Sequence, residues 1–178
     1  MNLAVFLWAA ALLSLERVTY LWIWHAPDKF QRRCGDSPLG DVRAPVVALR
    51  KLFYGFKILQ CTVFLVWCYI HGDGTFVALA GDAFVNFVGA ALIVIGQWLN
   101  VSVFYRLGNI GVFYGNRFGY EIPWNHKFPF SIIDHPQYVG ALLTIWGFFL
   151  VARFPHEDWY ILPTLETAYY FAGAYFEH

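Results

Sequence analysis

The residues best suited to chemistry lie in a polar, turn-forming segment between two apolar runs, from Gly96 to Gly140 of the 178-residue chain. Its most specific part is Asp-His-Pro-Gln-Tyr-Val-Gly at positions 134–140. Pro136 disfavours helical geometry at His135 and suits the first turn of a helix. We therefore expect Asp134 and His135 just ahead of a helix whose free N–H groups could hold an anion such as a carboxylate. The alternative is an ordinary helix start capped by Asp134.

A glycine-rich stretch lies upstream, with Gly108, Gly111 and Gly115 in the sequence Leu-Gly-Asn-Ile-Gly-Val-Phe-Tyr-Gly. Glycines allow the backbone to approach a ligand and to adopt positive φ. They also serve as packing sites in membrane helices, and this stretch lacks the strand–turn–helix context of a dinucleotide-binding fingerprint. By itself it leaves both interpretations open.

The elements that must position these residues are membrane helices. The chain is 59% hydrophobic and 13% charged, whereas a soluble domain would carry about 25% charged residues. The first three of five hydrophobic runs are long enough to span a bilayer, which takes about 20 residues, and the last two could form a tilted hairpin. We predict one all-α domain over residues 1–178, a polytopic membrane bundle of about five hydrophobic helices without a cleavable N-terminal signal. The runs are 3–24, 52–71, 78–103, 138–153 and 158–176.

The connecting loops differ in charge. Residues 25–51 and 104–136 carry Lys and Arg, whereas residues 71–82 carry neither. Basic loops stay in the cytosol, so both basic loops and the C-terminus should share the cytosolic side, with the N-terminus opposite. The net charge of zero gives no sign of a nucleic-acid partner, and the three cysteines form no CxxC or Cys/His cluster that would predict a metal site.

Polar side chains inside the runs should face the bundle interior or a cavity. Adjacent Glu16 and Arg17 point about 100° apart and should find separate partners. Glu166 either binds a cation or pairs with Arg17 or Lys57. Two helical stripes could pack helices together or line a site; they are Asp82, Asn86, Gly89, Gln97 and Asn100, and Glu166, Tyr170, Gly173 and Glu177.

Taken together, these motifs resemble the integral-membrane phospholipid N-methyltransferases, most closely the plant and fungal branch. The resemblance covers most of the chain, including GQWLN, LGNIGVFYGNRFG, IPW and FPFSIIDHPQYVG. It implies a cytosolic loop between the third and fourth helices that binds S-adenosylmethionine. The family often places a second acid or a basic tail after the last helix, whereas here His178 follows Glu177. The implied cofactor-binding residues are Gly108, Gly111, His135, Pro136, Tyr138, Gly140 and Glu177.

The resemblance also implies a reaction: methylation of phosphatidyl-N-methylethanolamine and its dimethyl form to phosphatidylcholine, in the endoplasmic reticulum membrane or a bacterial inner membrane. The amine must lose a proton, and of Glu121, His126, Asp134 and His135 we favour His135 or Asp134 as the base. Tyr114 and Trp124 could hold the charged head group by cation–π attraction. Arg106 and Arg117 could pair with the lipid phosphate or simply anchor the chain. A prenylcysteine carboxyl or other small-molecule methyltransferase, and a non-enzymatic scaffold or transport subunit, remain the alternatives.

Overall fold

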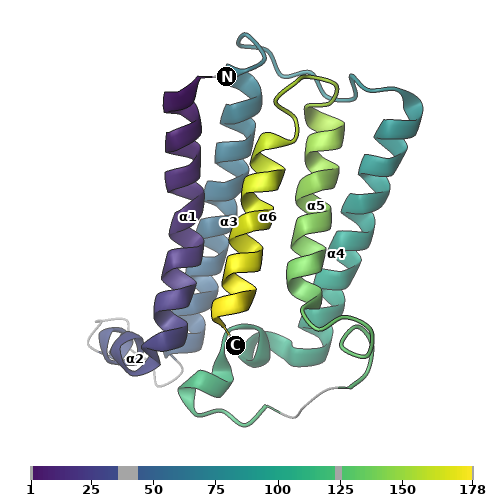
Figure 1. Cartoon of the computed structure of the whole chain (residues 1–178). Helices are drawn as coiled ribbons and strands as arrows, with labels where there is room; N and C mark the ends of the chain where they lie inside the picture. The colour runs from purple at the N-terminus through teal and green to yellow at the C-terminus, as the bar shows by residue number, and fades with distance from the viewer. Residues whose placement is uncertain (1, 36–43, 123–125, 178) are drawn as a thin grey trace.

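Five long helices lie side by side in the computed structural model, which describes residues 2–35, 44–122 and 126–177 (Figure 1). Within these residues there is no strand, so the predicted all-α membrane bundle is confirmed. Three segments are long and apolar enough to cross a membrane, Leu3–His25, Pro45–Ile70 and Ala83–Phe118, and a fourth apolar helix is shorter. The long helices are α1 (Leu3–His25), α3 (Ala44–Ile70), α4 (Ala83–Val112), α5 (Pro136–Ala152) and α6 (Ile161–Phe176), and two short elements are α2 (Pro27–Gly35) and the 3-10 helix η1 (Gly115–Phe118).

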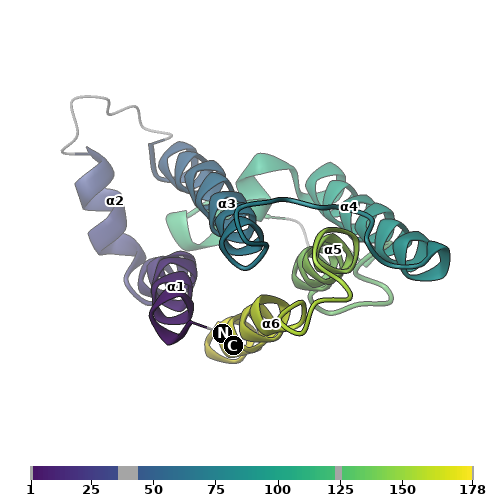
Figure 2. The ribbon, with the colours of Figure 1, turned by 90° about the horizontal axis from the view of Figure 1, so that it is seen from above.

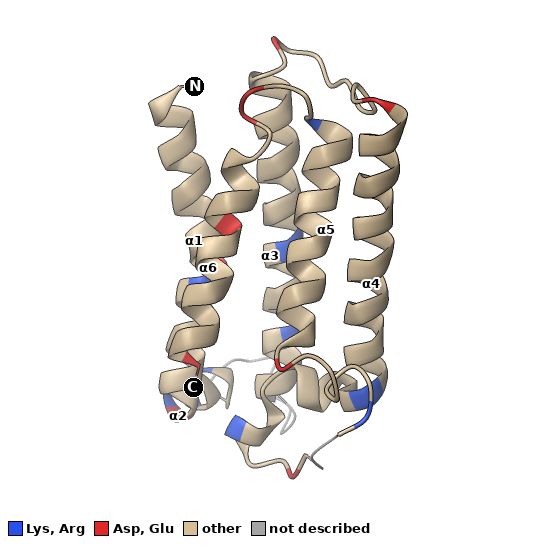
Figure 3. Ribbon diagram, turned by 45° about the vertical axis from the view of Figure 1, so that its right-hand side comes forward, with Lys and Arg blue, Asp and Glu red and all other residues tan. Residues whose placement is uncertain are grey.

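The two ends of the bundle differ in character. Helix α2, the connection between α4 and α5, and the C-terminus lie at one end, while the N-terminus and the other two connections lie at the opposite end (Figure 1). Charged residues gather toward the two ends, with few along the middle (Figure 3). The basic segments thus share one end with the C-terminus, as their charge predicted.

The helices differ from those predicted in several places. Helix α4 begins at Ala83 rather than at residue 78, and α6 begins at Ile161 rather than at residue 158. Residues 27–35 form a helix where a loop was expected, and α3 begins at Ala44 rather than at residue 52. Helix α4 continues to Val112 rather than ending near residue 103, so the glycine-rich stretch begins inside a helix. Charged and polar residues end a hydrophobic run without ending the helix that carries it, because the helix can continue into the interface.

Helices α4 and α5 approach closely through glycines. A Cβ atom on Gly140 would lie 2.7 Å from the Gly96 carbonyl oxygen and 2.9 Å from Asn100 Oδ1. One on Gly147 would lie 2.9 Å from the Ile93 backbone nitrogen. Small residues allow membrane helices to pack backbone against backbone, and this contact fixes the start of α5 against α4.

Replacing Gly140 by Val should therefore lower the stability of the bundle, because overpacking a close contact costs about 1–3 kcal/mol. Gly55→Val on α3 is the matched control, since a Cβ at Gly55 meets nothing within 4 Å. Thermal unfolding in detergent should show a lower midpoint for Gly140→Val alone. If Gly140→Val instead keeps its midpoint and loses only ligand affinity, Gly140 is a ligand contact rather than a packing residue.

At the other end, an ion pair closes the connection between α5 and α6. Arg153 Nη2 donates to Asp158 Oδ1 at 2.7 Å, and Trp67 Nε1 of α3 donates to Asp158 Oδ2 at 2.8 Å. Burial by itself would raise the pKa of Asp158, but the hydrogen bonds and charge of Arg153 outweigh it and hold this pKa below its ordinary value. The group therefore ties α3, α5 and α6 together far from the polar segment.

Candidate functional site

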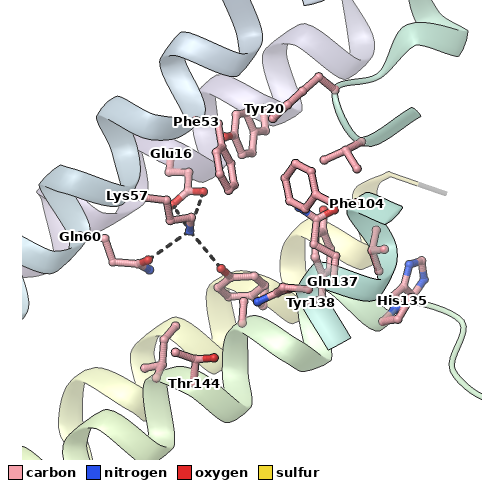
Figure 4. Close-up of a pocket in the computed structure, with 18 of the residues that line it drawn as sticks. Glu16, Tyr20, Phe53, Lys57, Gln60, Phe104, His135, Gln137, Tyr138 and Thr144 are labelled. Carbon is pink, nitrogen blue, oxygen red and sulfur yellow. Dashed lines mark hydrogen bonds and ion pairs between the residues drawn. The ribbon is translucent and has the colours of Figure 1, made fainter. Parts of the chain in front are cut away.

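A cavity of about 830 Å³ opens among the five long helices and reaches the end of the bundle that carries the C-terminus. Most of its wall is apolar, and a small number of polar groups point into it (Figure 4). An apolar cavity with few convergent polar groups is the usual form of a small-molecule site. Its wall includes Gly111, Tyr114, Asp134, His135, Pro136, Tyr138 and Glu177, all predicted as site residues.

Glu177 ends α6, and its carboxylate lies between two tyrosines. Tyr114, in the turn after α4, donates its hydroxyl to Glu177 Oε1 at 2.8 Å, and Tyr138 of α5 donates to Oε2 at 2.5 Å. The Glu177 backbone N–H caps α6 by donating to the Gly173 carbonyl. A carboxylate held by two tyrosine hydroxyls at a cavity wall suits a cation, because its negative charge attracts one.

Asp134 and His135 stand where the sequence placed them, ahead of α5 with Pro136 in the first turn. His135 is the N-cap residue, and its carbonyl accepts from the backbone N–H groups of Tyr138 and Val139 at 3.1 Å. The imidazole ring lies 5.8 Å from the Tyr138 ring at an angle of 22°. Both residues are exposed as well as lining the cavity, so they lie at its mouth.

The glycine-rich stretch lies at the end of α4 rather than in a free loop. Gly108 has φ 61° and ψ −177°, a conformation essentially reserved for glycine, and it breaks the helix. A Cβ on Gly111 would lie 2.7 Å from Leu107 Cβ, so a larger side chain there would disturb the helix end itself. Gly111 lines the cavity, whereas Gly108 and Gly140 are not among the lining residues.

The predicted lipid-binding arginines point elsewhere. Arg106 Nε donates to the Phe128 carbonyl at 3.0 Å, and the Arg117 guanidinium lies 3.6 Å from the centre of the Trp24 ring. Neither arginine lines the cavity, so their role in binding the phosphate stays a prediction without support from the geometry. Trp124 falls outside the described residues.

A charged cluster deeper in the cavity was not predicted as part of the site. Lys57 Nζ of α3 lies 3.1 Å from Glu16 Oε1 of α1 and donates to Gln60 Oε1 at 3.1 Å (Figure 4). Arg17 lies 3.6 Å from the same Glu16 oxygen, so the two neighbours share a contact rather than having wholly separate partners. The sequence indicated this cluster only through the presence of charged residues inside membrane-spanning runs, where they are costly unless they face the bundle interior or a cavity.

In each of the two polar stripes, on α4 and α6, some residues stabilise the helix or pack against neighbouring helices, and others line the cavity. On α4, Asp82 accepts from Val85 N and caps the helix, while Gln97 and Asn100 line the cavity. On α6, Glu166 accepts from Gln60 Nε2 at 2.7 Å and forms no ion pair with Arg17 or Lys57 among the described residues. Glu166 is therefore a packing residue, whereas Tyr170 and Glu177 face the cavity.

Comparison with known proteins identifies the family. The family model for phospholipid methyltransferases matches residues 84–178, which is more than half of the chain and includes α5, α6, Glu177 and all of α4 except its first residue. The chain therefore belongs to the phospholipid methyltransferase family.

One curated relative is similar to part of the chain. Phosphatidyl-N-methylethanolamine N-methyltransferase of Arabidopsis thaliana is 48% identical over 54 residues, which are 30% of this chain and 33% of the relative. The aligned part thus spans about a third of the relative's length. No solved structure matches the chain.

Proposed function

We propose that this protein transfers methyl groups from S-adenosylmethionine to the nitrogen of an ethanolamine phospholipid that already carries one or two methyl groups, giving phosphatidylcholine. The observation that carries the proposal is the cavity, which combines an apolar wall inside the membrane bundle with a carboxylate and two tyrosines at one end. Family membership and the plant relative support the reaction class. The proposed location is the endoplasmic reticulum membrane, or the inner membrane for a bacterial source.

A cavity of about 830 Å³ has the volume of an ordinary small-molecule site, and its polar groups support such a cofactor. Glu177, Tyr114 and Tyr138 would hold a positively charged group, and the buried Nε of Arg17 has no hydrogen-bond partner within the described part of the chain. When bound, S-adenosylmethionine supplies a methyl group on a positively charged sulfur, activated for in-line displacement. The walls would exclude water and align the reactants, and alignment of this kind is worth several kcal/mol.

The residues at the mouth would prepare the amine. An alkylammonium has a pKa near that of lysine, so only about 0.1% is free base at pH 7. Asp134 or His135 would accept the proton from the substrate nitrogen, and the nitrogen lone pair then becomes available for attack. Tyr114 and Tyr138 would hold the methylammonium product by their ring faces.

A lipid substrate also requires a way in from the bilayer. Several residues line the cavity and are exposed on membrane-spanning helices, so the cavity opens sideways between α3 and α4. The view along the bundle shows these helices at neighbouring positions on one side (Figure 2). An acyl chain could remain in the bilayer while the head group enters. The exposed lining residues are Tyr54, Cys61 and Leu65 on α3 and Gln97 and Val101 on α4.

The deciding experiment is lipid product analysis. Membranes containing the protein should convert mono- and dimethylated ethanolamine phospholipid to phosphatidylcholine when given labelled S-adenosylmethionine. Label in a prenylcysteine substrate, with none in lipid, would transfer the assignment to a carboxyl methyltransferase. Failure of the purified protein to bind S-adenosylmethionine would favour a scaffold or transport role.

Replacing Cys61 by Trp should slow lipid turnover about tenfold, a rise of about 1.4 kcal/mol in the barrier, because the larger side chain would narrow the side opening between α3 and α4. Ile58→Trp is the matched control, since Ile58 is exposed on the same helix but does not line the cavity. The measurement is the rate with dimethylated lipid together with affinity for S-adenosylmethionine. Equal rates for the two variants would show that lipid does not enter between α3 and α4.

A further inference from the structure

The guanidinium of Arg17 is a buried charge whose hydrogen-bonding capacity is largely unused. Arg17 is 7% exposed and lines the cavity. Its Nε has no hydrogen-bond partner among the described residues, and its Nη2 lies 3.6 Å from Glu16 Oε1. An arginine has five N–H donors, and a buried donor without a partner costs free energy. Some acceptor should therefore complete this site.

The nearby carboxylates do not supply that acceptor. Glu16 also pairs with Lys57, whose Nζ contacts Glu16, Gln60 and the Tyr170 hydroxyl at 3.1–3.4 Å. Lys57 is thus fully engaged by protein groups. Glu166 is bonded to Gln60. The Arg17 guanidinium instead lies over the Tyr170 ring, 3.6 Å from its centre, a contact that uses none of its N–H donors as hydrogen bonds.

Tyr20 adds a second unused group on the same wall. It is one turn further along α1, 9% exposed, and its hydroxyl has no partner in the described residues. The Arg17 guanidinium lies 6.0 Å from the Tyr20 ring centre. Both residues line the cavity, and Tyr20 points into it beside Phe53 (Figure 4).

The position of Arg17 along the helix is also informative. Arg17 lies eight residues before His25, the last residue of α1. At 1.5 Å per residue, this separation is about 12 Å along the helix axis. A surface arginine at this depth would extend toward the interface, whereas Arg17 stays inside the cavity. Charged residues at membrane depth that face a cavity mark ligand pathways.

We propose that Arg17 and Tyr20 form an oxyanion subsite that binds the anionic group of a zwitterionic ligand. This inference rests on the proposed function, and two ligands of that reaction carry such a group: the phospholipid has a phosphate, and the methyl donor has a carboxylate. The ring of Tyr138 lies 5.7 Å from the Arg17 guanidinium, while its hydroxyl bonds Glu177. One tyrosine therefore separates an anion subsite from a cation subsite, and a zwitterion can occupy both.

The test compares Arg17→Gln, Tyr20→Phe and the control Arg32→Gln, which changes an exposed arginine on α2. Binding of S-adenosylhomocysteine and of its analogue without the carboxylate is measured by calorimetry in detergent, and KM is measured for monomethylated lipid. Because charge-assisted hydrogen bonds are strong, Arg17→Gln should either weaken S-adenosylhomocysteine binding or raise the KM for lipid, in each case by about tenfold or more. Tyr20→Phe should change the same one of these two quantities, but by a smaller factor.

The two measurements show which ligand supplies the anionic group. A loss for S-adenosylhomocysteine that disappears with the decarboxylated analogue assigns the subsite to the carboxylate. A raised KM for lipid with unchanged S-adenosylhomocysteine affinity assigns it to the phosphate. Equal losses for both nucleoside probes would overturn the subsite, because the effect would not depend on an anion.

Two further results would also overturn the proposal, and a control separates it from the reaction itself. If Arg17→Gln folds and changes neither of these two quantities, the subsite does not exist. If Arg17→Gln fails to fold, Tyr20→Phe decides, since removing an unpartnered hydroxyl without a ligand role should leave affinity unchanged. If the unaltered chain neither binds S-adenosylhomocysteine nor methylates lipid, the proposed function is refuted. If the unaltered chain does both and the variants behave as it does, only the subsite is refuted.

Discussion

Replacing Glu177 by Gln should weaken S-adenosylmethionine binding by about tenfold or more, as expected when a partly desolvated charge-assisted contact is lost. The Glu177 carboxylate accepts from both Tyr114 and Tyr138. Gln keeps the shape but removes the charge, and its NH2 group cannot accept from the second tyrosine. The measurement is calorimetric affinity in detergent, with the unfolding midpoint recorded for each variant.

Tyr114→Phe and Tyr138→Phe are the controls for this prediction. Each removes one hydrogen bond to Glu177 but leaves the negative charge in place. If the charge matters, each tyrosine variant should lose less affinity than Glu177→Gln. Equal losses in all three would mean that the orientation of the carboxylate matters more than its charge, and an unchanged affinity for Glu177→Gln would remove this residue from the cofactor site.

The helices were predictable where hydrophobicity alone determines them. Each of the five apolar runs forms a helix over most of its length, because a chain in lipid must satisfy its backbone hydrogen bonds internally. Helix α2 was missed because residues 27–35 are polar, although Pro27 at the start, Asp28 in the first turn and Arg33 in the last turn are helix signals. Charged Arg50 and Lys51 hid the first two turns of α3 in the same way.

The residues at the mouth of the cavity could be grouped from the sequence because they are close together in the chain. Asp134, His135 and Tyr138 form one short motif, and all three line the cavity. The deep cluster was not predictable, since Arg17, Lys57 and Tyr170 come from three helices and no spacing along the chain connects them. The sequence showed that a charge inside a run needs a partner, but only the packing of α1 against α3 and α6 shows which partner it has.

The largest effect is expected at the base. If Asp134 or His135 accepts the amine proton, its removal should lower turnover by about 10²–10⁴-fold while cofactor affinity is retained. The variants are Asp134→Ala and His135→Ala, assayed with mono- and dimethylated lipid. Ser131→Ala is the matched control, because Ser131 is exposed in the same connection and does not line the cavity.

The pH–rate profile separates a base from a binding residue. Below the amine's own pKa, near 10, the free-base fraction rises about tenfold per pH unit. A variant without its base depends on that fraction, so its rate should climb with pH and recover part of the loss, whereas the unaltered protein should depend less steeply on pH once its base is deprotonated. His135 is held beside Tyr138, at 5.8 Å between rings, and Asp134 precedes it at the mouth, so the two profiles decide which residue takes the proton. A loss that is parallel at every pH and accompanied by loss of S-adenosylmethionine binding would instead make both residues cofactor ligands.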